Sequence, residues 1–293
     1  MEAIFQLVEA KGRWMTVGVL VLLLSWESLA PFFGFFRGDL KHRSLHAVRN
    51  FAMGVINSLM IAAVFVAAWL WAAELAYGKK IGILYFVDLP NCAHAVGAIL
   101  LLDFWTYWFH RMSHRVPFIW KFHRVHHSDN RMDVTTATRF HFGELFISSV
   151  LRTGIILLFG VQLWHVALYE LIMFPIVQFH HANVGVPAVA DRWLRALIVT
   201  PAMHKVHHSR LQPETDSNYT SMLSIWDRLF GSFRLRDNPH EIEFGLDHYD
   251  EPKSQGLTGM LGTPFHEPMG DAGEETGPAP GNPSDRRPEG PGE

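Results

Sequence analysis

Long apolar runs constrain this chain more than any other feature of its sequence. Four regions are candidates to enter a membrane: residues 14–36, 51–76, 91–109 and 145–179. The first two are each long enough to cross a bilayer core of about 30 Å as a helix. The fourth is too long for one span, and Gly160 and Gln162 near its middle favour a hairpin of two shorter helices. We therefore predict an all-α, integral-membrane helical bundle of about four or five spans.

The composition agrees with a membrane protein, because only 18% of the 293 residues are charged, against about 25% in soluble proteins. The first apolar run has a cleaved signal peptide as its alternative. It lacks a compact small-residue cleavage site and continues through Trp26 and Glu27, so we expect a retained helix. The single cysteine, Cys92, excludes an intrachain disulfide and any cysteine-based zinc or iron–sulfur site.

The C-terminal end differs from the rest of the chain. Residues 271–293 contain five Pro, five Gly, six acidic residues and two Arg. Their net charge is −4, and because the whole chain has −3, the first 270 residues carry +1. Such a composition buries too little apolar surface to fold. We predict N-terminal transmembrane helices over 1–90, a second unit over 91–252 that includes the hairpin 145–179, and a disordered, acidic Pro/Gly-rich tail over 253–293.

Orientation follows from the placement of Lys and Arg. The segments 37–50 and 110–143 carry four and six of them, whereas 77–90 carries only Lys79 and Lys80. Since cytoplasmic loops are the basic ones, we place 37–50, 110–143 and everything after about residue 180 in the cytoplasm, with the N-terminus outside. The body is nearly neutral and has no basic stripe, so no nucleic-acid partner is expected.

Histidine is the second unusual feature. Ten of the 18 His fall into four short groups at predicted cytoplasmic helix ends, and two of the groups are near copies, HRVHHS at 123–128 and HKVHHS at 204–209. The ten are His110, His114, His123, His126, His127, His180, His181, His204, His207 and His208. The other eight, including His42, His46, His165, His240, His248 and His266, are assigned to surface, interface or packing roles, and His94 to a satisfied position within the third span.

The grouped histidines predict a metal centre. Residues three and four apart share one face of a helix, so the rings within each group point together, and neutral imidazole is the commonest metal ligand. A single pair such as His180–His181 would be weak evidence. Three adjacent imidazoles, however, have no packing purpose and would repel one another if protonated. Groups from several helices can surround more than one ion, within a helical, histidine-rich cap on the cytoplasmic side.

The identity of the metal stays open at this point. The chain has no HExxH motif and no Glu followed three residues later by His, which disfavours a zincin protease and a ferritin-like carboxylate site. Nitrogen ligands suit Fe, Zn, Cu or Ni. The alternative to an enzyme is a metal transporter or sensor, but transport predicts ligands near the bilayer midplane rather than beyond the span ends.

The order HRMSH, HRVHHS, HHANV and HKVHHS between membrane spans resembles the fatty acid hydroxylase/sterol desaturase superfamily of integral-membrane di-iron enzymes. The similarity covers roughly residues 95–235 and includes LLDFWTYWFHR, TATRFH and SIWDRLFGSF. The resemblance makes 91–252 the catalytic unit. It implies two iron ions held by the ten grouped histidines, with molecular oxygen as co-substrate and a membrane lipid as substrate. The expected reaction is hydroxylation or desaturation of an unactivated C–H bond in a sterol, fatty acyl chain or related lipid.

Further groups are expected around such a site, because each ligating ring needs an acceptor for its free N–H. Asp103 lies seven residues before His110, two helical turns back on the same face. Asp103 and Glu144 are the expected catalytic-site carboxylates, with Asp129 and Asp227 as further candidates. The chain holds no flavin or nicotinamide motif, so an external electron donor, a ferredoxin or cytochrome b5-type protein, is required.

Two surface features admit more than one role. A basic stretch could dock an acidic electron donor or simply obey the positive-inside rule, and it comprises Arg111, Arg115, Lys121 and Arg124. Aromatic residues near the third span could line a lipid tunnel, although we favour an interfacial belt for most of them: Phe104, Trp105, Tyr107, Trp108 and Trp120.

Overall fold

The structure, a computed structural model, describes residues 2–266. Within this range every regular element is a helix or a helical turn, and strand-like pairing is limited to three isolated bridges. The prediction of an all-α fold is therefore confirmed for this part of the chain. The long helices are α1 (Glu2–Leu29), α2 (Leu40–Met60), α3 (Val66–Lys79), α4 (Asn91–Arg115), α6 (Phe142–Phe159) and α7 (Leu163–His181).

Shorter elements complete the fold. The α-helices among them are α5 (Pro117–His127), α8 (Ala188–Leu194), α9 (Pro201–His207), α10 (Gln212–Thr215), α11 (Ile225–Leu229) and α12 (Leu257–Gly262). A π-helical turn, η1 (Ile61–Phe65), joins α2 to α3. The 3-10 turns are η2 (Ile83–Tyr85), η3 (Val134–Thr138), η4 (Pro239–Glu241) and η5 (Thr263–Phe265).

Three helical segments of the described chain are long and apolar enough to cross a membrane: Leu40–Tyr85, Asn91–Arg115 and Phe142–Phe159. The apolar part of α1, Trp14–Leu29, is shorter. Helix α7 is not among the three, and it carries polar side chains such as Glu170 and Gln178 within its length. Membrane crossing by α1 and α7, and with it a count of four or five spans, stays a prediction.

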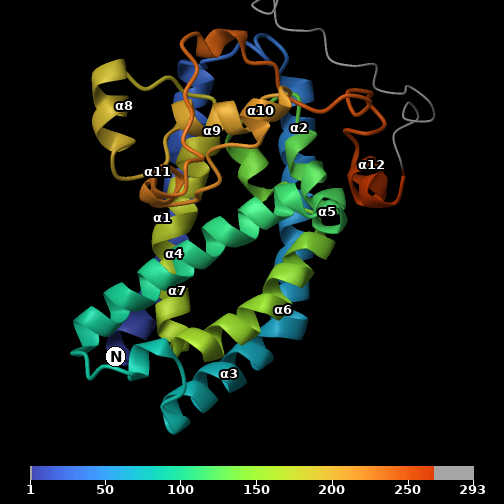
Figure 1. The fold of residues 1–293 in the computed structure, drawn as a ribbon. Helices are drawn as coiled ribbons and strands as arrows, with labels where there is room; N and C mark the ends of the chain where they lie inside the picture. Colours follow the sequence, from blue (N-terminus) through green and yellow to red (C-terminus); the bar gives the residue numbers. More distant parts are fainter. Residues whose placement is uncertain (1, 267–293) are drawn as a thin grey trace, which may run out of the picture.

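The long helices form a bundle in which α1 runs beside α7, α3 beside α6, and α4 crosses α7 (Figure 1). The largest buried apolar cluster lies among α3, α4, α6 and α7 and includes Phe65, Trp69, Leu102, Ile156 and Tyr169. Helix α6 ends and α7 begins at a turn in which Gly160 adopts φ 74°. This tight turn folds the apolar region 145–179 back on itself as two helices.

We call residues 116–141 and 182–266 the cap. It contains α5 and α8–α12, and it covers the end of the bundle at which α4 and α7 terminate (Figure 1). The four histidine groups of the sequence meet between bundle and cap. Helix α4 ends at His110–His114, α5 at His123–His127, α7 at His180–His181, and α9 in the group His204–His208.

The predicted disordered tail begins too early, at residue 253. Residues 257–265 form α12 and η5, and Met260 is fully buried beside Met53 and Val125. Arg124 donates to the carbonyl oxygen of Thr263 at 2.7 Å. The sequence LTGMLGTPF is apolar enough to pack on α5, unlike the acidic stretch 271–293, which lies outside the described residues.

Candidate metal centre

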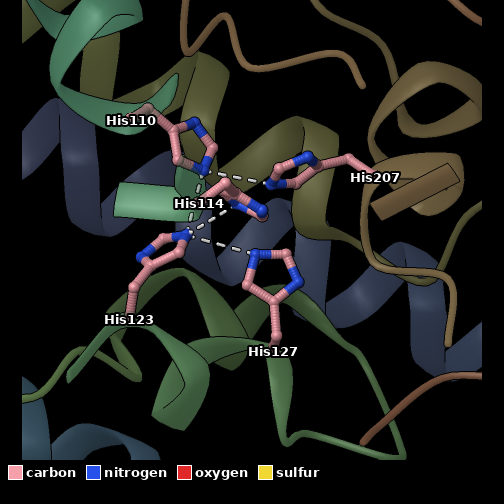
Figure 2. A group of neighbouring side chains, drawn as sticks. All are labelled: His110, His114, His123, His127 and His207. Carbon is pink, nitrogen blue, oxygen red and sulfur yellow. Dashed lines mark hydrogen bonds between the residues drawn. The ribbon is translucent and has the colours of Figure 1, made fainter. Parts of the chain in front are cut away.

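Five histidine rings from three helices form the first group (Figure 2). His110 and His114 come from α4, His123 and His127 from α5, and His207 from α9. The Nε2 atom of His123 lies 3.1 Å from that of His110, 3.1 Å from that of His114 and 3.2 Å from that of His127. The Nε2 atoms of His110 and His207 are 3.0 Å apart. His123 is therefore the centre of this group.

Four buried rings form the second group: His126 of α5, His181 of α7, His204 of α9 and the following His208. The Nε2 atoms are again close, at 3.1 Å for His126–His181, 3.0 Å for His181–His204 and 3.1 Å for His204–His208. The rings of His127 and His208 stack with centroids 4.5 Å apart, so the two groups adjoin.

The spacing of these nitrogens fits metal ligation. Metal–nitrogen bonds of about 2.1 Å at right angles place neighbouring ligand atoms about 3.0 Å apart. In each group the candidate ligand atoms all lie within 4.8 Å of one another. Burial, with added repulsion from neighbouring imidazoles, lowers the pKa of several rings well below the ordinary histidine value, among them His126, His127, His204 and His208. These rings are therefore neutral, which is the form that binds metal.

Hydrogen bonds to the outer nitrogen fix three of the five rings of the first group, whereas His127 Nδ1 is buried without a partner among the described residues. His110 Nδ1 donates to the carbonyl oxygen of Tyr219 at 2.6 Å, and His207 Nδ1 donates to that of Ser217 at 2.6 Å. His123 Nδ1 lies 2.9 Å from the buried carboxylate of Glu144. Since a carbonyl oxygen only accepts, the proton sits on Nδ1 and the lone pair of Nε2 faces the group.

The second group has fewer such bonds. His181 Nδ1 donates to the carbonyl oxygen of Val177 at 2.7 Å. The Nδ1 atoms of His126, His204 and His208 are buried with no hydrogen-bond partner among the described residues. Stacking replaces the missing bond for His126, whose ring lies 4.2 Å from that of Phe140 at an interplanar angle of 13°.

The structure thus brings nine of the ten predicted histidines into two groups. His180 belongs to neither, although it is buried and its ring centroid is 3.9 Å from that of His204. It lines the second group from outside, and its role as a ligand stays a prediction.

The two carboxylates that we expected at the site have different positions. Glu144 contacts a ligating ring, as described above. Asp103 instead accepts hydrogen bonds from Tyr169 Oη at 3.2 Å, Leu223 N at 3.1 Å and Trp226 Nε1 at 2.8 Å. Seven residues of helix rise by about 10.5 Å, which is too far for its carboxylate to reach His110. In the described structure Asp103 connects α4 to α7 and α11. We expected it to accept a hydrogen bond from a ligating histidine, and that expectation was wrong.

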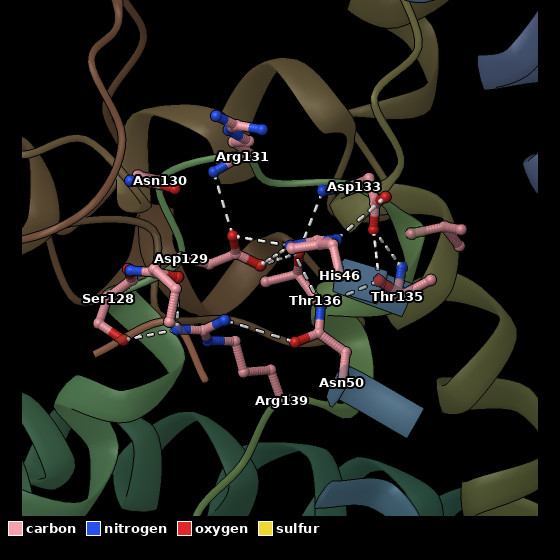
Figure 3. Close-up of polar contacts among 12 residues, drawn as sticks. His46, Asn50, Ser128, Asp129, Asn130, Arg131, Asp133, Thr135, Thr136 and Arg139 are labelled. Atoms are coloured by element: carbon pink, nitrogen blue, oxygen red, sulfur yellow. Dashed lines mark hydrogen bonds and ion pairs between the residues drawn. The ribbon is translucent and has the colours of Figure 1, made fainter. Parts of the chain in front are cut away.

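Asp129 and Asp227 also hold the surroundings rather than the rings. Figure 3 shows Asp129 beside His46, whose Nε2 is 3.0 Å from both carboxylate oxygens, while Thr136 Oγ1 donates at 2.7 Å. Although burial raises the pKa of Asp129, the charges of His46 and Arg139 bring it well below its usual range. His46, predicted to have a surface or packing role, is therefore a polar contact between α2 and the cap.

Asp227 accepts from Tyr219 N at 2.8 Å and from Ser232 Oγ at 2.8 Å. It holds the loop in which the carbonyl oxygen of Tyr219 accepts the hydrogen bond from His110. Sequence reasoning missed this loop, including Asp216, whose carboxylate lies 3.5 Å from His114 Nδ1. Backbone carbonyls leave no mark in a sequence, but an acidic residue eight positions after a histidine group was available as a signal.

Two surface predictions need correction. Tyr107 is fully buried, with its hydroxyl 2.9 Å from Ser232 Oγ, and the Trp120 ring is 5.2 Å from that of His114, so neither belongs to an interfacial belt. Arg124 is buried and donates to carbonyl oxygens of the cap, so it is not free to dock a partner. Arg115 remains largely exposed.

Known proteins are similar to this chain in the region that contains the histidine groups. Residues 95–232 match the family model described as fatty acid hydroxylase. Alkylglycerol monooxygenase of Homo sapiens is 32% identical over 151 residues, which cover 52% of this chain and 32% of that protein. Ornithine lipid hydroxylase OlsE of Rhizobium tropici is 29% identical over 180 residues, covering 60% of this chain and 51% of that protein.

A third relative, a cholesterol 25-hydroxylase-like protein of Danio rerio, is 25% identical over 170 residues, covering 57% of this chain and 64% of the relative. The chain therefore spans between about a third and two thirds of the length of these relatives. No solved structure matches the chain.

Proposed function

Because residues 95–232 belong to the fatty acid hydroxylase family, we propose that the chain is a membrane-bound, oxygen-dependent lipid hydroxylase that uses two iron ions. The observation that carries this proposal is the pair of adjoining histidine groups, with Nε2 atoms 3.0–3.2 Å apart within each. One ion would be held by His110, His114, His123, His127 and His207. The other would be held by His126, His181, His204 and His208, with His180 beside them.

The bound iron would supply the oxidation of an unactivated C–H bond by molecular oxygen. In the overall reaction one oxygen atom enters the lipid as a hydroxyl group and the other leaves as water, with two electrons and two protons supplied from outside. The electrons would come from a ferredoxin or a cytochrome b5-type protein. Arg115, the last residue of α4 and next to His114, is largely exposed and would contact such a donor.

The chain's own residues prepare the site in two ways. Glu144 accepts from His123 and keeps that ring in the tautomer with a free Nε2 lone pair, as the carbonyl oxygens of Tyr219 and Ser217 do for His110 and His207. Burial of most of the rings between bundle and cap would keep water away from the bond that is oxidised. We place this site on the cytoplasmic side, following the distribution of Lys and Arg.

Hydroxylation is favoured over desaturation because the names of the three relatives describe a monooxygenase and hydroxylases. The substrate class is identified by the lipid that gains oxygen, whether an alkyl-ether lipid, an amino lipid, a sterol or a fatty acyl chain. Desaturation, or a role as a metal transporter or sensor, would appear as a different outcome of the same experiment.

The test is lipid mass spectrometry on membranes that contain the full-length, iron-loaded protein, a reductant and isotopically labelled oxygen. We expect a lipid that gains one labelled oxygen atom, and we expect the His123→Ala variant to lose this product. The exposed His42→Ala variant is the matched control and should keep it. A lipid that loses two hydrogens without gaining oxygen would mean desaturation. An unchanged lipid profile with the loaded, reduced protein would contradict the proposal.

A further inference from the structure

A second polar site lies at the opposite end of the bundle from the histidine groups. A cavity of about 310 Å³ is lined there by residues from the α3–α4 connection, the start of α4 and the α6–α7 turn. His94 lines it, 16 residues before His110 on the same helix, which corresponds to about 24 Å along the axis. The cavity is therefore separate from the proposed metal centre, and no function is assigned to it by the family resemblance.

Two glycines hold together the two segments whose residues line this cavity. Gly82 has φ 113°, and a Cβ atom added to it would lie 2.2 Å from the backbone nitrogen of Gly160. Gly160 has φ 74°, and a Cβ atom there would lie 2.7 Å from the carbonyl oxygen of Ile81. Because only glycine permits this approach, the α3–α4 connection packs directly on the α6–α7 turn. The cavity is thus built by close backbone contact rather than left by loose packing.

Two stacked histidines in this cavity have N–H groups without acceptors. The rings of His94 and His165 have centroids 5.0 Å apart at an interplanar angle of 23°. Gln162 N donates to His165 Nδ1 at 2.9 Å, so the proton of the neutral ring sits on Nε2. That Nε2 atom and both ring nitrogens of His94 are buried with no hydrogen-bond partner among the described residues, so the prediction of a satisfied His94 is corrected. Unpaired buried donors are costly, which points to an acceptor that completes the site.

A lysine adds positive charge beside these donors. The Lys80 ammonium lies 4.6 Å from the ring centroid of Tyr77 and 4.9 Å from that of Tyr85, so two aromatic faces hold it at the cavity. Asp88 is the one acidic residue among the residues that line the cavity. A held ammonium together with two N–H donors suits an oxyanion with several acceptor oxygens, such as a phosphate group.

The surroundings of the cavity indicate where such a phosphate would come from. Next to it, Phe86, Val87 and Ile83 expose apolar side chains, with Phe86 84% exposed. Ile83 lies at the end of one segment that is long and apolar enough to cross a membrane, and Phe86 and Val87 lie between that segment and the next. Lysine and aromatic residues at such positions meet the headgroup layer of a bilayer, while apolar side chains meet its acyl chains. We propose that this cavity binds the phosphate group of a membrane phospholipid.

The test uses the full-length protein in a neutral detergent and counts bound molecules by native mass spectrometry. The probes are dioctanoyl phosphatidylglycerol, dioctanoylglycerol with the same chains but no phosphate, and inorganic phosphate. We expect one phosphatidylglycerol per chain to bind saturably and the other two probes to bind much more weakly. Lys80→Gln should weaken phosphatidylglycerol about tenfold, because it removes a charge-assisted contact. Lys79→Gln, at the neighbouring exposed lysine outside the cavity, should leave binding unchanged.

A second variant separates recognition from folding. His94→Phe keeps an aromatic ring against His165 and removes both nitrogens without partners. It should weaken phosphatidylglycerol without lowering the melting temperature of the lipid-free protein. Equal affinity for dioctanoylglycerol, or equal effects of Lys79→Gln and Lys80→Gln, would overturn the proposal. Inorganic phosphate that binds as tightly as the lipid would overturn the lipid assignment and leave an anion site. None of these outcomes depends on metal content or hydroxylase activity.

Discussion

The two histidine groups are alike in their inner nitrogens and differ in their outer ones. In the first group, His110, His123 and His207 each have an acceptor 2.6–2.9 Å from Nδ1. In the second group, only His181 has one among the described residues. Directional hydrogen bonds therefore orient three rings of the first group before any metal binds. His127 of that group and most of the second group rely on stacked rings and on the ion itself. The difference predicts that the two groups respond differently to substitution of their surroundings.

The largest effect is expected from His123→Ala. Its Nε2 atom lies within 3.2 Å of three other ligand atoms, so its loss removes the centre of the first group. Bound iron should fall from two ions to one per chain, and lipid hydroxylation should fall by more than the roughly 10–100-fold that changes outside the ligand shell cause. Metal analysis of purified protein, beside His42→Ala, checks this. Two ions retained by His123→Ala would contradict the ligand assignment.

Glu144 tests the hydrogen-bonded support of the first group. Glu144→Ala removes the acceptor of His123 Nδ1, and we expect about 10–100-fold weaker binding of one of the two ions. Glu144→Gln keeps an acceptor oxygen and should restore most of the affinity. Metal titration of the apo-protein measures both variants. If Ala and Gln behave alike, the hydrogen bond is not what positions the ring.

Phe140 tests the stacked support of the second group. Phe140→Leu keeps an apolar side chain but removes the face that lies 4.2 Å from the His126 ring. Aromatic pairs contribute about 0.5–1.5 kcal/mol, so the ion of the second group should bind about two- to thirteenfold more weakly. The same titration should show a smaller effect on the first group, because its His123 ring is farther from Phe140, at 6.4 Å. Equal weakening of both sites by this substitution would mean that the groups act as one unit.

The smallest effect on metal is expected at Asp103. Asp103→Asn leaves three donors facing a weaker acceptor, so the protein should lose about 1–3 kcal/mol of stability. Bound metal per chain should not change, because its carboxylate contacts none of the grouped rings in the described structure. Loss of an ion without loss of stability would show that Asp103 supports the metal centre and would contradict its structural role.

Particular residues show which features of the site the sequence predicts and why it does not predict the others. Helical spacing predicted that the rings of each short sequence group point together. The structure divides the two HxxHH groups instead, because His123, His127 and His207 lie in the first metal group and His126, His204 and His208 in the second. The pairing of those groups across α4, α5, α7 and α9 is tertiary and was not predictable from spacing. The Asp103 prediction followed the face of α4 but not its rise along the axis. The carbonyl oxygens of Tyr219 and Ser217 carry no side-chain signature, and the folding of residues 257–265 onto α5 depends on a surface formed elsewhere.

The central claim is that each histidine group holds one metal ion. Anomalous diffraction from crystals of the full-length, metal-loaded protein, recorded on both sides of the iron absorption edge, tests it most directly. We expect two peaks that vanish below the edge, one among the Nε2 atoms of His110, His114, His123, His127 and His207, and one among those of His126, His181, His204 and His208. A single peak, or peaks away from these nitrogens, would contradict it.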